Sequence, residues 1–486
     1  METDKKSSPP DPEATSEGEL PPQVEAAWGD NDSDPAYPRN FTRTKKWTII
    51  TVLSIASFGV TSASSIYTST YDQMEAAFGN ARLVSTAGLS VFVLGLAFGP
   101  LLFSPLSEFY GRRPMYLVAW TFHLLWIIPQ AVAPNVATLI VGRFLEGFSG
   151  SCFLAVSAGT VHDLFSKQQL RHPMALFTVS PFLGPCIGPL IGGLINYNLH
   201  WRWTYYVLII WTFVMLLAIV VLVPETSHPI LLDKRTRKLA ATSSEGRCKE
   251  STAKHKSTRT IAAAIGRSLA TPFKLLILEP MCLALCMYSA ILLGILYLFF
   301  GAFPLVFSRN YGFNQWQSGF SFLGIGVGLV LGVFADLQWR GAWERMIARM
   351  VGAEPEVRLI PATIGAPIAS VGIFIFAWTS IPEVHWIVPM IGSTVFGVGY
   401  FLIFAGIFTF LVRALDVLSS CLSFRKTDAL LVEAIFPLFG QQMYTGVGFQ
   451  WASSVLGFMT VAMLPFPYLF LVYGKRIRSR SRFAAS

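Results

Sequence analysis

Two ionisable residues, Arg143 and Glu146, stand three positions apart inside a long apolar stretch. An ionised side chain within a membrane is costly unless it pairs or faces water. Residues i and i+3 share one face of a helix, so the two side chains can reach each other. A carboxylate beside a guanidinium, in a cavity whose water content changes with conformation, has two different proton affinities. The pair is therefore a candidate site for proton coupling, with a static buried salt bridge as the alternative.

Other chemistry has little support in the sequence. The seven histidines are scattered rather than grouped as a membrane oxygenase would need, and no Walker sequence for binding ATP is present. The six cysteines lie mostly in apolar runs, with neither a disulfide framework nor the spacing of a zinc site. We therefore expect a protein that is not an enzyme and that holds no cofactor or metal.

The composition indicates which elements hold the charged pair. Of the chain, 53% is hydrophobic and 13% charged, against roughly 45–50% and about 25% in soluble proteins. Most of it must lie in lipid, where the backbone satisfies its own hydrogen bonds, and long continuous apolar runs favour helices over a barrel. We predict an all-α integral membrane protein with twelve transmembrane helices in two six-helix halves. The expected spans are 47–69, 84–106, 114–133, 136–163, 173–197, 203–223, 279–305, 316–336, 359–380, 386–412, 414–442 and 448–473.

The distribution of charge divides the chain into five segments and orients it. Most basic residues between and after the spans fall on one side, and the positive-inside rule places that side, with both termini, in the cytosol. This distribution indicates that the net charge of +9 faces the membrane surface and does not serve to bind a nucleic acid. The segments are a disordered cytosolic tail (1–46), an N-terminal half (47–223), a basic linker (224–278), a C-terminal half (279–473) and a basic tail (474–486).

The loop between the second and third spans gathers Glu108, Gly111, Arg112 and Arg113. Glu108 can lie near the positive end of a neighbouring helix, and the arginines can pair across the cytosolic seam between the halves. Such a cluster would latch one conformation and release it in the other. Residues 99–114 resemble the signature loop of the major facilitator superfamily, in the form of fungal drug:proton antiporters. Arginines that only follow the positive-inside rule are the alternative reading.

The same resemblance extends to other charged residues. Arg143 matches the superfamily's helix-four motif, where the arginine is tied to proton transfer. We interpret Asp163 at the end of the fourth span, and Asp336 with Arg340 in the second half, as further parts of a latch rather than as substrate contacts.

The fifth span contains glycines and prolines at short intervals. Glycines so spaced give a flat face for another helix, and the prolines kink the helix where a hinge would be useful. The segment resembles the antiporter signature that separates exporters from uptake carriers, and simple helix packing is the alternative. The motif comprises Gly184, Pro185, Gly188, Pro189, Gly192 and Gly193.

Two places depart from the resemblance. Gly301 stands where relatives often have glutamate. The absence of this carboxylate would shift the substrate preference from cationic compounds to neutral or acidic ones. Residues 413–433 replace an Ala/Ser-rich eleventh helix with a stretch that includes Arg425, Lys426 and Asp428, each costing roughly 2.5–3.5 kcal/mol at the centre of a span. True divergence of the sequence would explain this stretch, and so would a reading-frame or intron error.

The resemblance implies a monomeric proton-coupled antiporter in the plasma membrane, or alternatively the vacuolar membrane. It would export small organic compounds such as drugs, toxins, secondary metabolites or polyamines from a fungal cell. A nutrient symporter and a non-transporting paralogue or receptor are the alternatives. Aromatic walls bind flat molecules with little directional demand, so we expect the substrate near the midplane against Tyr67, Phe182, Tyr297, Phe300 and Tyr400.

Overall fold

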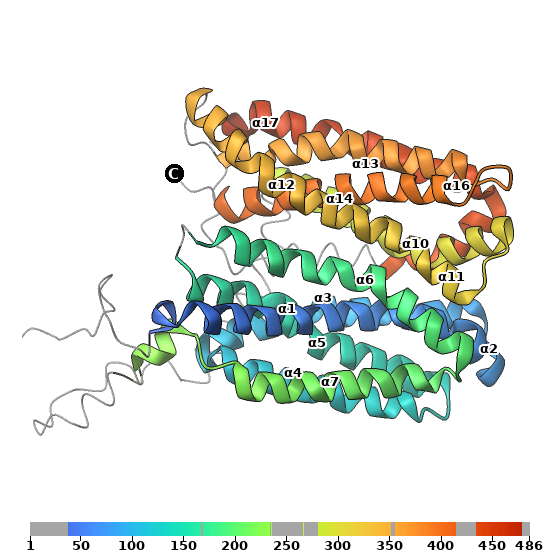
Figure 1. Cartoon of the computed structure of the whole chain (residues 1–486), viewed down its shortest axis with the longest axis horizontal. Helices are drawn as coiled ribbons and strands as arrows, with labels where there is room; N and C mark the ends of the chain where they lie inside the picture. Colours follow the sequence, from blue (N-terminus) through green and yellow to red (C-terminus); the bar gives the residue numbers. More distant parts are fainter. Residues whose placement is uncertain are drawn as a thin grey trace, which may run out of the picture.

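The computed structural model describes an α-helical molecule. It covers residues 37–166, 169–233, 280–350, 355–414 and 434–478, together with Arg235 and Gly266, and this part of the chain contains no strand. Long helices run alongside one another in two groups, one from each half of the sequence (Figure 1). Within the described ranges, ten helical stretches are long and apolar enough to cross a membrane. The all-α, two-halved architecture predicted above is confirmed.

The N-terminal half begins earlier than expected. α1 starts at Arg43 rather than residue 47, because the Thr42 side chain caps its first turn by accepting from the Lys45 amide at 3.4 Å. The half comprises η1 (Pro38–Asn40), α1 (Arg43–Ile66), η2 (Tyr67–Thr70), α2 (Tyr71–Phe78), α3 (Arg82–Tyr110), α4 (Arg112–Ala131), α5 (Val136–Leu164), α6 (Arg171–Asn198) and α7 (Arg202–Leu222).

The C-terminal half repeats the pattern of long helices. It comprises α10 (Pro280–Tyr311), α11 (Gln315–Phe320), α12 (Leu323–Met350), η4 (Pro355–Leu359), α13 (Ile360–Thr379), α14 (Ile387–Ala414), a helical segment at 434–447, α16 (Phe449–Met463) and α17 (Pro465–Arg478). Of the unusual stretch 413–433, residues 415–433 lie outside the described part of the chain, as do most of the N-terminal tail, the linker and the end of the C-terminal tail. The predicted boundaries there stay predictions.

Small residues bring helices of one half into close contact. α3 packs along α5 and α1 along α6, while α13 and α12 pack along α14. A Cβ added at Gly95 of α3 would lie 2.7 Å from the Phe148 amide of α5, and one at Gly397 of α14 would lie 2.6 Å from the Ile325 carbonyl of α12. Backbones can approach this closely only where no side chain intervenes, which is how helices pack inside a membrane.

The outer faces of the helices are apolar. On α7, Ile210 is 62% exposed and Val221 is 77% exposed, and a lipid environment suits such a surface. Figure 1 shows α2 and α11 at one end of the molecule, hereafter the α2–α11 end, and the start of α1 at the opposite end. α6 meets α11 and α12 across the boundary between the halves.

Candidate functional site

The Arg143–Glu146 pair lies fully buried on α5. Both side chains have no exposed surface, and Arg143 Nη1 lies 3.1 Å from Glu146 Oε2. The guanidinium also donates to two backbone carbonyls of α1, from Nη1 to Ala63 at 2.9 Å and from Nη2 to Ser64 at 3.1 Å. The charge therefore binds α5 to α1 as well as to its own helix.

Glu146 is held unevenly by its two oxygens. Oε2 accepts from Arg143 and from Gln130 Nε2 of α4 at 3.0 Å, whereas Oε1 has no hydrogen-bond partner among the described residues. His123 of α4 meets the Glu146 carbonyl through Nδ1 at 3.0 Å and stacks on Trp120. A proton can therefore be added at Oε1 without displacing either donor at Oε2.

Two aromatic rings enclose the guanidinium of Arg143. Its carbon lies 4.4 Å from the Tyr67 ring and 4.5 Å from the Phe92 ring, distances typical of cation–π contacts. Tyr67 is 1% exposed and donates its hydroxyl to the Ser85 carbonyl at 3.0 Å. The structure therefore places Tyr67, predicted as a substrate contact, against the charged pair.

A hydrogen bond joins this site to the C-terminal half. The Ser64 hydroxyl donates to the Thr61 carbonyl at 2.7 Å, and Tyr297 of α10 lies 3.0 Å from the Ser64 oxygen. Because the serine proton is used within α1, Tyr297 is the donor in this contact. Tyr297 is 3% exposed. Ser64 thus accepts from Arg143 through its carbonyl and from the other half through its hydroxyl.

The signature loop closes around a carboxylate that the sequence analysis did not assign to the site. Gly111 adopts φ +100°, in the region that favours glycine, and a Cβ there would lie 2.9 Å from the Glu225 carboxyl carbon. The backbone amides of Arg112 and Arg113 donate to that carboxylate at 2.9 and 3.2 Å. Glu225 also caps the chain that follows it, accepting from the Ser227 amide at 2.9 Å.

The remaining residues of the predicted latch lie in different surroundings. Arg112 Nε lies 3.3 Å from Asp163 at the end of α5, while Glu108 is exposed and forms no ion pair with a described residue. None of the partners described for Arg112 and Arg113 lies in the C-terminal half, so pairing across the seam stays a prediction. Asp336 is buried in α12, and the Arg340 side chain lies outside the described part of the chain.

The antiporter motif presents two faces of α6. Gly184, Gly188 and Gly192 face α1, and a Cβ at Gly188 would lie 2.8 Å from the Ser62 carbonyl. Gly193 faces α11 of the other half, where a Cβ would lie 2.8 Å from the Gln315 carbonyl. Pro185 and Pro189 lie inside the helix, and the Pro189 carbonyl packs closely against Gly319 of α11. Part of the motif therefore lines the boundary between the halves.

Two of the other predicted substrate residues, Phe182 and Tyr400, meet at that same boundary. Phe182 of α6 lies edge-on to Tyr400 and Phe404 of α14, with centroid distances of 5.6 and 4.4 Å. Tyr400 has no exposed surface and Phe182 is 8% exposed. These rings fill the space between the halves, whereas Phe300 lines a cavity at the α2–α11 end.

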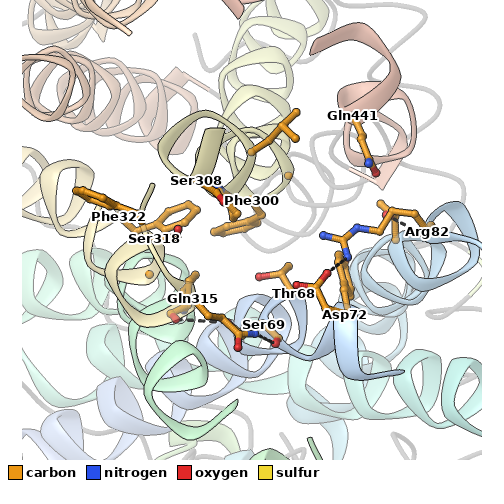
Figure 2. A pocket seen from close by; sticks show the side chains of 18 of the residues that line it. Thr68, Ser69, Asp72, Arg82, Phe300, Ser308, Gln315, Ser318, Phe322 and Gln441 are labelled. Carbon is orange, nitrogen blue, oxygen red and sulfur yellow. Dashed lines mark hydrogen bonds and ion pairs between the residues drawn. The ribbon is translucent and has the colours of Figure 1, made fainter. Parts of the chain in front are cut away.

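That cavity has a volume of about 400 Å³ and lies between the halves (Figure 2). A volume in this range suits a small organic molecule. Its lining combines polar side chains with the apolar surface of α10, and it includes residues from both halves of the chain. They are Thr68, Ser69, Tyr71, Asp72, Arg82, Thr86, Leu89, Pro189, Phe300, Gly301, Pro304, Leu305, Ser308, Arg309, Phe313, Asn314, Gln315, Ser318, Gly319, Phe322, Pro437 and Gln441.

Most residues of these sites were not assigned from the sequence, and Gln130, Glu225 and Ser64 show why. Gln130 is a polar residue in an apolar span, which is a weak signal that could have been followed. Glu225 stands two residues after the end of the sixth expected span, and no spacing links it to Gly111. Ser64 is one of many small residues in α1. The described residues contain no group of three or more His, Cys, Asp or Glu placed to hold a metal.

Comparison with known proteins gives a consistent picture. The family model described as Major Facilitator Superfamily matches residues 17–427. "Efflux pump atB" of Aspergillus terreus is 44% identical over 94% of this chain and 89% of its own length. "Probable drug/proton antiporter YHK8" of Saccharomyces cerevisiae is 36% identical over 95% of this chain and 90% of its own.

The fold is also found among solved structures. A partially occluded inward-open structure of the xylose transporter XylE from E. coli has a TM-score of 0.64 and 15% identity, covering 88% of this chain and 98% of that one. At this identity the likeness concerns the fold alone. With a family model over most of its length and relatives above 30% identity, the chain belongs to the major facilitator superfamily.

Proposed function

We propose that this protein is a proton-coupled antiporter that exports small organic compounds. The observation that carries the proposal is the buried Arg143–Glu146 pair, whose arginine binds α1 at the residue that contacts the C-terminal half. Relatives of this chain are named as efflux pumps and as a drug/proton antiporter, and the glycine face of α6 supports export over uptake.

The coupling mechanism follows from the charges. Protonation of Glu146 removes the counter-charge of Arg143 in a place without access to bulk water. Leaving one charge of a buried pair unpaired costs about 3–5 kcal/mol. The protonated state therefore favours a conformation in which the guanidinium reaches water or another partner. Since Arg143 holds α1 at Ala63 and Ser64, its movement alters the contact of α1 with α10.

The signature loop is the latch of this cycle. Glu225, held by the amides around Gly111, joins the end of α7 to the α3–α4 turn. The Arg112–Asp163 pair adds the end of α5 to the same cluster. Together these contacts make the N-terminal half move as one body. The arginines would pair with the C-terminal half when the halves close at this end, with Asp336 and Arg340 as the corresponding elements of that half.

The orientation follows from the basic segments. With both termini cytosolic, the signature loop faces the cytosol and the α2–α11 end faces outward. The protein acts in the plasma membrane, with the vacuolar membrane as the alternative, and as a monomer, since one fold of this kind contains a complete path. Compounds cross between the halves, past the rings of Phe182 and Tyr400. Symport is not favoured, because the likeness to XylE is limited to the fold.

The test is export from yeast cells that lack their own broad-specificity exporters. Cells expressing the chain should retain less of some compounds in a panel, and a protonophore should restore retention. Glu146→Gln should abolish this proton-dependent export while exchange of labelled for unlabelled substrate continues, because exchange needs no net proton movement. Glu383→Gln, at an exposed carboxylate, is the matched control and should behave as the wild type. Proton-dependent export that survives in both Glu146→Gln and Arg143→Ala contradicts the proposed mechanism.

A further inference from the structure

The cavity at the α2–α11 end is built largely on one face of α10. Phe300, Pro304 and Ser308 recur every four residues, and so do Gly301, Leu305 and Arg309. Residues four apart lie above one another on a helix, so these two rows form a continuous wall. Over the eight residues from Gly301 to Arg309, a helix rises by about 12 Å. Arg309 therefore stands near the helix end, with the apolar residues deeper in the molecule.

The two arginines that line the cavity differ in whether they are already paired with a carboxylate. The cavity's ionisable lining residues are Asp72, Arg82 and Arg309. Arg82 is neutralised twice, by Asp72 at 2.7 Å and by Glu75 at 3.2 Å, as Figure 2 shows for Asp72. Arg309 is exposed and forms no ion pair with a described residue. One guanidinium, with its five donors, thus remains available to an anion.

The position of Gly301 reinforces this asymmetry. A Cβ added at Gly301 would meet no atom within 4 Å, so the backbone borders open space in the cavity. A carboxylate side chain at this position would fit there and would oppose an anionic ligand. Glycine instead leaves room beside the Phe300 ring, which packs on Phe322 with a centroid distance of 5.4 Å. The inner wall is therefore apolar and aromatic.

The polar groups beside the wall are mostly already engaged. Asn314 and Gln317 cap each other at the start of α11, and Gln315 donates across the halves to the Ser69 carbonyl. The Tyr71 hydroxyl is buried without a hydrogen-bond partner among the described residues. Specific recognition in this cavity therefore depends on Arg309, with the Tyr71 hydroxyl as a secondary group.

We propose that this cavity binds organic carboxylates with an apolar, ring-containing body, as the outward-facing site of the compounds that the protein exports. The carboxylate pairs with Arg309, and the ring lies against Phe300 in the space left by Gly301. This inference rests on the proposed export function, since it names the class of compound and the side on which it is released.

The cavity is also in contact with the proton site. The Arg82 guanidinium lies 4.7 Å from the Tyr71 ring, Tyr71 meets Tyr67 edge-on at 5.2 Å, and Tyr67 covers Arg143. A ligand that displaces Tyr71 therefore acts on the ring that packs against the coupling arginine. This chain of contacts gives an anion in the cavity a physical route to the proton site.

The experiment measures binding to the full chain in lipid nanodiscs by calorimetry. Three probes share one ring system and differ in charge: 2-naphthoate, 2-naphthamide and 2-naphthylmethylammonium. Wild-type protein should bind naphthoate roughly tenfold more tightly than naphthamide, the ratio that one well-formed charged contact supplies. Arg309→Gln should reduce this ratio to below about twofold while leaving naphthamide binding unchanged. Arg202→Gln, at an arginine of the same end that does not line the cavity, should keep the wild-type ratio.

Gly301→Glu provides the second arm. It should weaken naphthoate binding and strengthen binding of the ammonium probe, because it adds a carboxylate to the cavity. Should Arg309→Gln fail to fold, Gly301→Glu decides alone. The proposal is overturned if naphthoate does not bind, if it binds no better than naphthamide, or if either folded variant keeps the wild-type ratio.

The same probes in the yeast assay separate this inference from the export function. Export of naphthamide and of the ammonium probe without preference for the carboxylate keeps the exporter and refutes the cavity's role. Naphthoate binding that depends on Arg309, in a protein that exports nothing, keeps the cavity and refutes the exporter.

Discussion

The hydrogen bond from Tyr297 to Ser64 allows a prediction of how much one contact favours the state in which the two halves are closed at the α2–α11 end. Tyr297→Phe removes the donor but leaves the Ser64 proton bonded to the Thr61 carbonyl, so no buried donor is orphaned. The loss should then be the net value of one hydrogen bond, about 1 kcal/mol. If the contact exists only while the halves are closed at the α2–α11 end, the population of the open state rises about fivefold.

The assay is the reactivity of a cysteine introduced at Ser318. This residue of α11 lines the cavity and is 4% exposed, so a membrane-impermeant thiol reagent reaches it when the halves part. Labelling of the native cysteines is measured in the protein without the Ser318→Cys substitution and subtracted. Tyr297→Phe should increase the labelling rate about fivefold. Tyr288→Phe is the matched control, because this buried hydroxyl of the same helix has no hydrogen bond among the described residues.

A double-mutant cycle with Ser64→Ala completes the test. If the two side chains act through one bond, Tyr297→Phe should have little further effect once Ser64 is alanine. Labelling rates that do not change in Tyr297→Phe, or effects of the two substitutions that simply add, would show that this bond does not hold the halves together.

Two further predictions concern glycines. Gly111→Ala should lower the free energy of unfolding by about 1–3 kcal/mol, measured by denaturation in detergent, because of its positive φ and its contact with Glu225. Gly448→Ala, at nearly the same backbone angles (φ +89°, ψ 157° against φ +100°, ψ 168°) but with no atom near its Cβ, should cost less, and equal costs would mean that Glu225 adds nothing. Gly193→Ala should slow transport and raise Ser318→Cys labelling by forcing α6 from α11, whereas Gly446→Ala, which has open space, should not. Unchanged labelling in Gly193→Ala would show that the two helices can part without cost.

Continuous apolar runs made the long helices predictable. The fourth expected span, 136–163, differs from α5 by one residue, since the apolar run and the Asn135 cap mark the same start. α2 was missed because Tyr71–Phe78 is short and partly polar, with no signal that separates it from a loop. α10 extends to Tyr311, beyond the expected end at residue 305, because an interfacial helix tolerates Ser308 and Arg309.

The candidate site was predictable only where its residues are neighbours in the sequence. Arg143 and Glu146 are three residues apart, so helical geometry alone brings them together. Glu225 lies 113 positions from Arg112 and Tyr297 lies 233 positions from Ser64, and nothing local indicates such contacts. The aromatic residues show the same limit, since an aromatic ring can pack against a cation, a second ring or a ligand. Only the structure shows that Tyr67 packs against a cation and that Phe182 packs against a second ring.

The place where Arg143 meets α1 explains why one ion pair can influence the whole molecule. In a regular α-helix the carbonyls of Ala63 and Ser64 accept from the amides four residues on. Here α1 gives way to the 3₁₀ turn η2 at Tyr67, whose amide donates to the Ser65 carbonyl instead. The guanidinium therefore bonds carbonyls at a break in the helical ladder, a feature often found at functional hinges. Release of Arg143 leaves the buried Ala63 carbonyl in need of a partner, and the nearest remedy is a rearrangement of α1 that also moves Ser64 relative to Tyr297. Proton transfer at α5 and contact between the halves thus act on the same few residues of backbone.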